Sequence, residues 1–207
     1  MSWTRRDSFS FPVVKASISN SLNDIAMKVF LMIARLLYEK GYCEYVEMAR
    51  YIKARHPDCR FLVVGGYDPD FPGHITDEVI RKDVESGAIE YLGFLDDVRD
   101  VIRNADCLVH PSFYNEGFSR VLMEAAALSC PVITTCIPGC REFVEDGDAG
   151  LLCMPKDVKS LCEAVETFLS LPESRRKEMG RNGRRMVEAR CDVRDVIDIY
   201  MSFTAGI

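Results

Sequence analysis

The sequence has no long apolar run, no closely spaced cysteine pair and no excess of positive charge. Its longest apolar run, near residues 29–37, is interrupted by Arg35 and is too short to span a bilayer. The N-terminus lacks the apolar segment that a secretory signal peptide requires. The net charge of −6 argues against general nucleic-acid binding, which usually needs a basic surface. We therefore expect no membrane span and no nucleic-acid partner.

Nine cysteines are scattered through the 207 residues, and no two of them form a CxxC pair. Cys136 and Cys140 are four residues apart across a Pro-Gly turn, and the three histidines are distant from one another in the sequence. This spacing does not match that of protein zinc sites. We expect reduced thiols, no bound metal and a cytoplasmic location.

Short apolar runs alternate with helical patterns along most of the chain. The runs that indicate buried strands cover residues 29–34, 60–64, 89–94, 107–109, 131–135 and 150–153. The helical patterns cover residues 42–55, 76–86, 96–104, 118–128, 141–145, 158–169, 172–190 and 193–203. This alternation predicts a single α/β domain over residues 29–207, with a doubly wound, Rossmann-like, six-stranded parallel sheet and C-terminal helices. Residues 1–28 are interpreted as a linker or leader, or alternatively as a short arm packed on the domain.

Doubly wound sheets bind ligands at the carboxyl ends of their strands, where the strand order reverses. Arg35 and Lys40 follow the first strand and would meet a ligand at that edge. An arginine fork and a lysine point charge suit a diphosphate. The alternative is that both are solvated loop charges, with or without pairing to Glu39.

Residues 110–124 combine a strand end, a glycine turn at Gly117 and the start of a helix. This arrangement presents main-chain N–H groups and a positive dipole end to an anion. Glu116 and Glu124 flank the helix start, roughly 10–12 Å apart along its axis, which is about the length of a sugar, a diphosphate and a ribose. Glu116 could instead cap the helix, and Glu124 could be a surface residue. The apolar neighbours of Glu124 favour partial burial, and a buried carboxylate needs partners.

The segment Glu116-Gly-Phe-Ser-Arg-Val-Leu-Met-Glu124 resembles the E-x7-E motif of retaining glycosyltransferases of the GT-B fold. The likeness is to glycosyltransferase family 4, the glycosyl transferases group 1 domain, and extends to residues 30–41, 91–97, 131–142 and 146–152. It is similar in particular to enzymes that build capsular polysaccharides, exopolysaccharides or lipid-linked oligosaccharides.

The resemblance implies a role for each candidate residue. Arg35 and Lys40 would contact the diphosphate of a UDP-sugar, Glu116 the sugar hydroxyls, and Glu124 the ribose. Main-chain groups complete the implied site: Gly117, Phe118 and Ser119 at the sugar and diphosphate, and Phe94, Leu95 and Val98 at the base. The family uses no metal at the diphosphate, so the triplet Asp68-Pro69-Asp70 is expected to form a turn.

The resemblance covers only the donor-binding, C-terminal half of such enzymes. None of His56, His74 and His110 lies where the family's catalytic histidine belongs, so we expect the acceptor domain to be missing and the isolated chain to be inactive. The implied whole enzyme is a retaining hexosyl or N-acetylhexosaminyl transferase. The alternative is a non-catalytic nucleotide-sugar-binding module, or half of a split enzyme that needs a partner chain.

Two other functions receive less support from the sequence. A dinucleotide-dependent dehydrogenase is disfavoured, because no G-x-G-x-x-G follows the first strand. The basic residues between Arg175 and Arg185 are interleaved with glutamates, which favours a solvated helix face. Peripheral association of the full enzyme with the inner face of the cell membrane stays open as an alternative.

Overall fold

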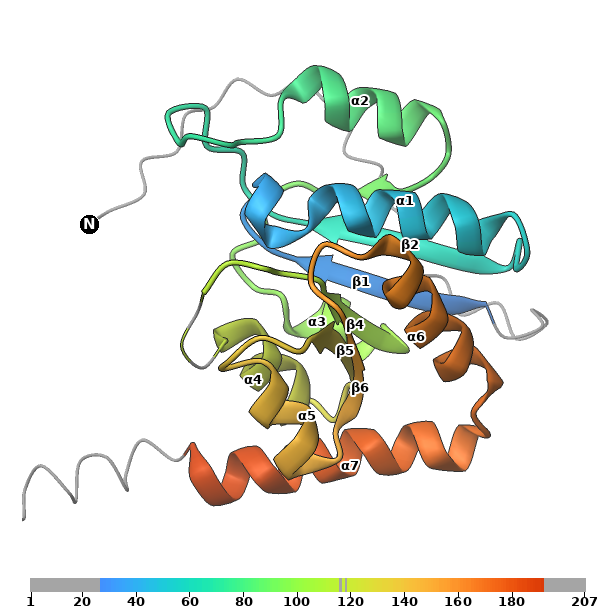
Figure 1. The fold of residues 1–207 in the computed structure, drawn as a ribbon, viewed down its shortest axis with the longest axis vertical. Coiled ribbons are helices and arrows are strands. Elements are labelled where there is room, and N and C mark those ends of the chain that lie inside the picture. Colours follow the sequence, from blue (N-terminus) through green and yellow to red (C-terminus); the bar gives the residue numbers. More distant parts are fainter. Residues whose placement is uncertain (1–26, 116, 118, 192–207) are drawn as a thin grey trace, which may run out of the picture.

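The computed structural model describes residues 27–115, 117 and 119–191 of the chain. A six-stranded parallel sheet forms its centre, in the order β3-β2-β1-β4-β5-β6 (Figure 1). Its strands are β1 (Lys28–Ile33), β2 (Cys59–Val64), β3 (Glu90–Tyr91), β4 (Cys107–His110), β5 (Val132–Thr135) and β6 (Gly150–Cys153). The strand order reverses between β1 and β4, so the switch point of the sheet lies between these two strands.

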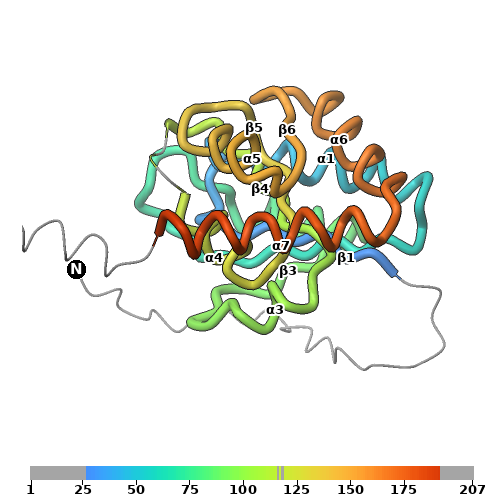
Figure 2. Tube along the Cα trace, turned by 90° about the horizontal axis from the view of Figure 1, so that it is seen from below, coloured from blue at the N-terminus to red at the C-terminus, as the bar shows by residue number. Residues whose placement is uncertain are grey.

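Helices cover both faces of the sheet. The first face carries α1 (Tyr42–Lys53), α2 (Asp77–Glu85) and α6 (Val158–Ser170). The second carries α3 (Arg99–Arg103), α4 (Arg120–Ala127), α5 (Arg141–Gly147) and α7 (Glu173–Arg190), and Figure 2 shows α7 running across it. A short 3-10 helix, η1 (Tyr38–Lys40), lies between β1 and α1.

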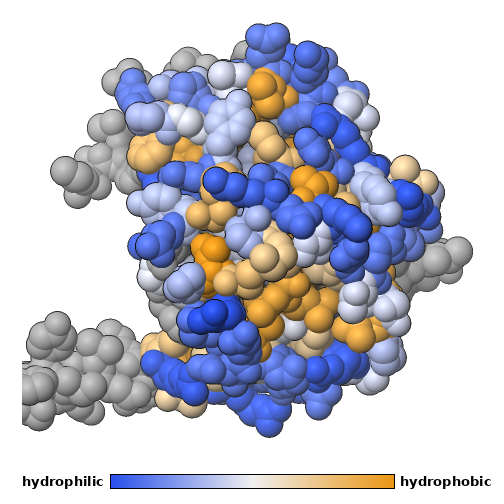
Figure 3. Space-filling view, in the orientation of Figure 1, coloured by the Kyte–Doolittle hydropathy of each residue, from blue (hydrophilic) through white to orange (hydrophobic). Residues whose placement is uncertain are grey.

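Alternate residues of each central strand enter two separate cores, as the period of a strand requires. Phe30 and Met32 of β1 pack with α1 and α6, whereas Leu31 packs with α4 and α5 on the opposite face. All three side chains are fully buried. Figure 3 shows a largely hydrophilic surface around a central apolar region near β6, which is one of the two edge strands of the sheet.

The sequence predicted this fold class and all six strands, but it placed one strand end and two helix starts wrongly. The third strand was expected to continue to residue 94 and ends at Tyr91, because Gly93 adopts a left-handed φ of 74° and turns the chain out of the sheet. The helices expected from residues 96 and 118 begin at Arg99 and Arg120. The helix expected over residues 193–203 and residues 1–26 of the linker expected over residues 1–28 lie outside the described residues, whereas Lys28 already belongs to β1.

No helix in the described ranges is long and apolar enough to cross a membrane.

Candidate functional site

The loops that follow β1 and β4 are joined at the switch point of the sheet. The carbonyl oxygen of Glu39, in η1, accepts hydrogen bonds from the main-chain N–H groups of Phe113 (3.0 Å) and Tyr114 (3.2 Å). Gly41 has a φ of 77°, and a Cβ atom there would lie 2.2 Å from the carbonyl oxygen of Pro111. Only glycine permits both the conformation and the contact. The two loops therefore form one unit at the carboxyl edge of the sheet, on the left in Figure 1.

Arg35 and Lys40 both lie on this unit, and each cation is stacked on an aromatic ring. The Arg35 Cζ atom lies 4.6 Å from the centroid of the Phe71 ring, and the Lys40 Nζ atom lies 4.4 Å from that of Tyr114. Neither forms an ion pair with Glu39, so that pairing is not found, and solvated loop charges stay the alternative. Arg35 forms no hydrogen bond or ion pair with any described residue, which leaves its donors available to a ligand.

The start of α4 differs from a conventional capped helix. Ser119 is the N-cap residue, but its hydroxyl lies 3.3 Å from Nε2 of His110 and does not cap a main-chain N–H group. Both side chains are almost fully buried. His110 also accepts a hydrogen bond at its carbonyl oxygen from the Thr134 hydroxyl (2.9 Å), so it bonds locally at the end of β4. Gly117 is exposed, and the predictions for Glu116 and Phe118 concern residues outside those described.

A pocket of about 470 Å³ brings together two segments that the sequence analysis predicted separately. Glu124 of α4 and the loop before α3 line it, with Asp96, Asp97, Val98, Arg99, Ala127 and Leu128 as the other lining residues. Its volume falls within the range of small-molecule sites. Glu124 is half-buried, as predicted, and forms no hydrogen bond or ion pair with a described residue. Its carboxylate is therefore free to accept hydrogen bonds from a ligand's hydroxyl groups.

The loop that lines the other side of this pocket is fixed at both ends. Asp97 accepts hydrogen bonds from the guanidinium (2.6–3.0 Å) and the main-chain N–H (2.9 Å) of Arg99, which hold the pKa of its carboxyl well below the usual range. Leu95 and Val98 pack against the second core, whereas Phe94 is 66% exposed. The apolar side chains thus anchor the loop, and the Phe94 ring stays at its surface.

The sequence analysis missed the aromatic partners of the two cations and one further cation. Phe71 and Tyr114 lie in loops at the carboxyl edge, so the rule that located Arg35 could also have found them. Lys156 follows β6, and its Nζ atom lies 4.6 Å from the centroid of the Phe113 ring. No sequence signal linked Lys156 to Phe113, because the contact depends on how the loops after β4 and β6 fold.

The acidic triplet at Asp68 forms a turn, as predicted. The main-chain N–H of Phe71 donates to the carbonyl oxygen of Asp68 at 3.1 Å, which closes the turn. Within the described ranges, no group of three His, Cys, Asp or Glu side chains is arranged to hold a metal ion. The expectation of a metal-free diphosphate site stays a prediction.

The basic residues of α7 are mostly paired. Arg175 contacts Asp148 and Glu178, and the remaining pairs are Lys177 with Glu173, Arg184 with Glu188, and Arg190 with Asp146. Arg176, Arg181 and Arg185 have no carboxylate partner among the described residues, and Arg176 donates instead to the carbonyl oxygens of Leu169 and Leu171. This mixed-charge surface matches the solvated helix face that the sequence favoured.

A parallel sheet of this order, with helices on both faces, defines a Rossmann-like α/β domain of the GT-B glycosyltransferase type. The chain belongs to the glycosyl transferases group 1 family, whose model matches residues 17–186. This confirms the family resemblance seen in the sequence.

Three similar proteins illustrate the relationship. The N,N'-diacetylbacillosaminyl-diphospho-undecaprenol alpha-1,3-N-acetylgalactosaminyltransferase of Campylobacter jejuni is 33% identical over 162 residues, which are 78% of this chain and 40% of that protein. The structure of Anabaena Alr3699/HepE in complex with UDP has a TM-score of 0.75 at 21% identity, over 86% of this chain and 49% of that one. The C-terminal domain of a glycosyl transferase group 1 family protein, LpcC from Francisella tularensis, has a TM-score of 0.66 at 25% identity, over 80% of this chain and 87% of that one. The chain thus spans 40% of the length of its curated relative.

Proposed function

We propose that the chain is the donor-binding half of a retaining glycosyltransferase that transfers a hexosyl or N-acetylhexosaminyl group from a UDP-sugar to a polysaccharide or lipid-linked acceptor. The observation that carries the proposal is the pocket in which Glu124 faces the loop around Val98. In the proposed complex, Glu124 accepts hydrogen bonds from the ribose hydroxyls. Main-chain groups of residues 94–98 contact the uracil, and the Phe94 ring borders it.

The cations beyond this pocket would bind the diphosphate. Arg35 and Lys40 would neutralise the charge that develops on the departing nucleoside diphosphate, with the N–H groups at the start of α4 adding to the field. Glu116 would accept hydrogen bonds from the sugar hydroxyls. No metal is required in this arrangement, because fixed cations supply the positive charge.

The comparisons supply support of different kinds. The structural neighbour from Anabaena was solved with UDP, which supports the choice of nucleotide. The relative from Campylobacter is named for transfer of an N-acetylgalactosaminyl group to an undecaprenol-linked acceptor, which supports the sugar and acceptor classes. Reaction with retention rests on the resemblance of residues 116–124 to the family motif.

Titration calorimetry with UDP and with uridine tests the assignment. We expect Arg35→Ala to weaken UDP binding about tenfold and to leave uridine binding unchanged, since it removes a charge-assisted hydrogen bond to phosphate. Glu124→Ala is expected to weaken both ligands about tenfold, because both carry the ribose.

Two exposed positions outside the site provide matched charge controls. Arg181→Ala and Glu47→Ala remove the same charges from α7 and α1, where neither residue pairs with a described carboxylate or cation. Both controls should bind UDP as the unaltered chain does. UDP binding that neither Arg35→Ala nor Glu124→Ala weakens would refute the site.

An activity assay distinguishes the proposal from its alternative. In the alternative, the chain is a non-catalytic module, or half of a split enzyme that needs a partner chain. The isolated chain is expected to bind UDP without transferring sugar, and to need an acceptor-binding domain for transfer. Turnover of a UDP-sugar by the chain alone would exclude the non-catalytic module.

The proposed cellular location is cytoplasmic, in keeping with nine free thiols. Attachment to the inner face of a membrane would depend on Arg176, Arg181 and Arg185, the cations of α7 without a carboxylate partner among the described residues. The other cations of α7 that contact carboxylates have little charge left for anionic lipids.

A further inference from the structure

We propose that Phe71 is a positioning residue that holds the Arg35 guanidinium in place for a diphosphate. The inference rests on the proposed function of Arg35, and it assigns the loop between β2 and α2 to the donor site. That loop contains the Asp68-Pro69-Asp70 turn, which has no other role in the site.

The stacking geometry provides the first reason. The Arg35 Cζ atom lies 4.6 Å from the Phe71 ring centroid, within the range of a cation–π contact. A ring restrains the guanidinium without using its five N–H donors and without neutralising its charge. A carboxylate partner would do both and would compete with phosphate. Holding the side chain in advance also lowers the entropy lost when a ligand binds.

The second reason is that the loop is hydrogen-bonded to the Arg35 segment at both of its ends. The N–H of Leu36 donates to the carbonyl of Gly66 (3.1 Å), and the N–H of Tyr38 donates to that of Gly73 (2.9 Å). Leu37 and His74 form an antiparallel bridge between the two segments. Phe71 and Arg35 therefore belong to one hydrogen-bonded unit, and their contact does not depend on a free loop.

The third reason is that Phe71 itself is fixed from both sides. The turn that begins at Asp68 ends at the N–H of Phe71. The carbonyl oxygen of Phe71 lies 3.0 Å from Nδ1 of His74, whose ring packs edge-on against Tyr67 at a centroid distance of 5.4 Å. The turn and the histidine together set the direction of the chain at Phe71.

Several arginines of the chain are held by carboxylates, whereas Arg55, away from the site, lies over the Tyr51 ring. Arg60, Arg99 and Arg175 are each oriented by a carboxylate at 2.6–2.7 Å. Arg35 is instead oriented by a ring, and Lys40, the other cation proposed for the diphosphate, also lies over one. At Arg35 the ring thus restrains the guanidinium, and no carboxylate among the described residues neutralises its charge.

The test uses the full chain, calorimetry with UDP and uridine, and three substitutions of Phe71. We expect Phe71→Ala and Phe71→Leu to weaken UDP binding about fivefold, equal to about 1 kcal/mol, and to leave uridine binding unchanged. Phe71→Tyr keeps the ring face and should restore the affinity of the unaltered chain. The leucine variant keeps an apolar side chain at the position, which guards against a result caused by misfolding.

Tyr51→Ala is the matched control. Its ring supports Arg55 at 3.6 Å near the far end of α1, so the variant removes a similar pair away from the site. It should bind UDP normally.

The proposal fails if Phe71→Leu binds UDP as the unaltered chain does, or if Phe71→Ala weakens uridine as much as UDP. If Arg35→Ala weakens UDP and the Phe71 variants do not, the positioning role is wrong and the proposed function stands. If Arg35→Ala has no effect on UDP, the assignment of Arg35 to the diphosphate fails first.

Discussion

Gly41 shows how one residue shapes the site. It has a φ of 77°, it is the N-cap of α1, and it faces the carbonyl oxygen of Pro111 across the switch point. A side chain there would meet two separate penalties: the left-handed conformation, and a main-chain atom that cannot move without shifting the loop after β4. The position therefore links helix α1 to the loop that precedes Glu124.

We predict that Gly41→Ala lowers the free energy of unfolding by about 3 kcal/mol and also weakens UDP binding, since it forces the two loops apart. Urea denaturation and calorimetry measure the two effects. Gly87→Ala is the control, because Gly87 has a φ of 72° but no atom within 4 Å of the added Cβ. It should cost only about 1–2 kcal/mol and leave UDP binding intact. Equal costs at the two positions would show that the close approach to Pro111 is unimportant.

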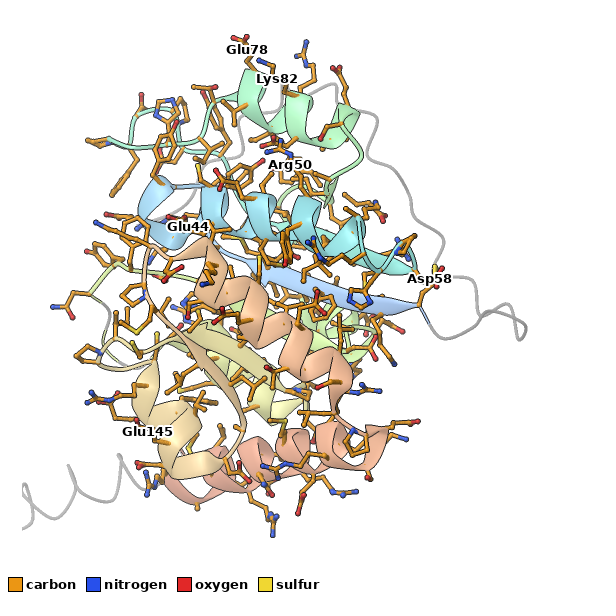
Figure 4. The ribbon with its side chains drawn as sticks, turned by 45° about the vertical axis from the view of Figure 1, so that its right-hand side comes forward. Glu44, Arg50, Asp58, Glu78, Lys82 and Glu145 are labelled. Atoms are coloured by element: carbon orange, nitrogen blue, oxygen red, sulfur yellow. The ribbon has the colours of Figure 1, made fainter. Side chains whose placement is uncertain are left out.

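At the scale of elements, helix α2 could be predicted from the sequence, but the contacts that hold it against α1 could not. Thr76 caps the helix through the N–H of Val79, as its sequence position indicated. Only Ile80 and Asp83 of α2 are buried, and Figure 4 shows Glu78 and Lys82 on its outer side. An aspartate inside a helix gives no sequence signal of a partner 33 or 41 residues away. The contact between Asp83 and α1 can therefore be identified only from the structure, in which α1 and α2 lie side by side.

The buried carboxylate of Asp83 joins the two helices. It accepts hydrogen bonds from the Tyr42 hydroxyl (3.0 Å) and from Arg50 (2.5 Å), which lies between α1 and α2 in Figure 4. Burial and the adjacent Asp83 raise the pKa of Tyr42 well above its usual value, so its hydroxyl remains a donor.

We predict that Asp83→Ala lowers the free energy of unfolding by about 2 kcal/mol, because it leaves the buried Tyr42 hydroxyl without an acceptor. Tyr42→Phe removes only one hydrogen bond and should cost about 1 kcal/mol. Urea denaturation of the two variants measures both losses of stability. Glu85→Ala, an exposed change on the same helix, should be nearly neutral. An Asp83→Ala variant as stable as Glu85→Ala would show that this contact does not hold α2 in place.

At the scale of the whole molecule, the pattern of apolar runs was sufficient to predict the sheet. It was not sufficient to predict the contacts between loops. Buried strands such as β1 and β2 contain continuous apolar runs, so the number of strands could be predicted. The end of β3 depends on the conformation of Gly93, and the Arg35–Phe71 contact joins loops from two strands. Glu124 could be predicted, because a carboxylate in an apolar helix is conspicuous. Its pocket depends on how α3 and α4 pack.

The helix α7, the last one in the described part of the chain, illustrates the same limit, because two glycines within it have a packing role. A Cβ atom at Gly180 would lie 2.0 Å from the carbonyl oxygen of Ser129, directly after α4. At Gly183 it would lie 3.1–3.2 Å from the Cβ atoms of Ala149 and Ala126. Both glycines are buried, so α7 closes the second face of the sheet at a distance that only small residues allow.

Alanine normally stabilises a helix by about 1 kcal/mol relative to glycine. The sign of the change in the free energy of unfolding therefore shows whether close packing requires the glycine. We predict that Gly180→Ala lowers the free energy of unfolding by about 2 kcal/mol, because the clash is with a main-chain oxygen. Gly183→Ala should be close to neutral, since its contacts are tight but not prohibitive and helix propensity offsets them. Arg181→Ala, between the two, should also be nearly neutral. Urea denaturation of the three variants gives the order, and a stabilising Gly180→Ala would mean that α7 does not approach the chain at Ser129 in solution.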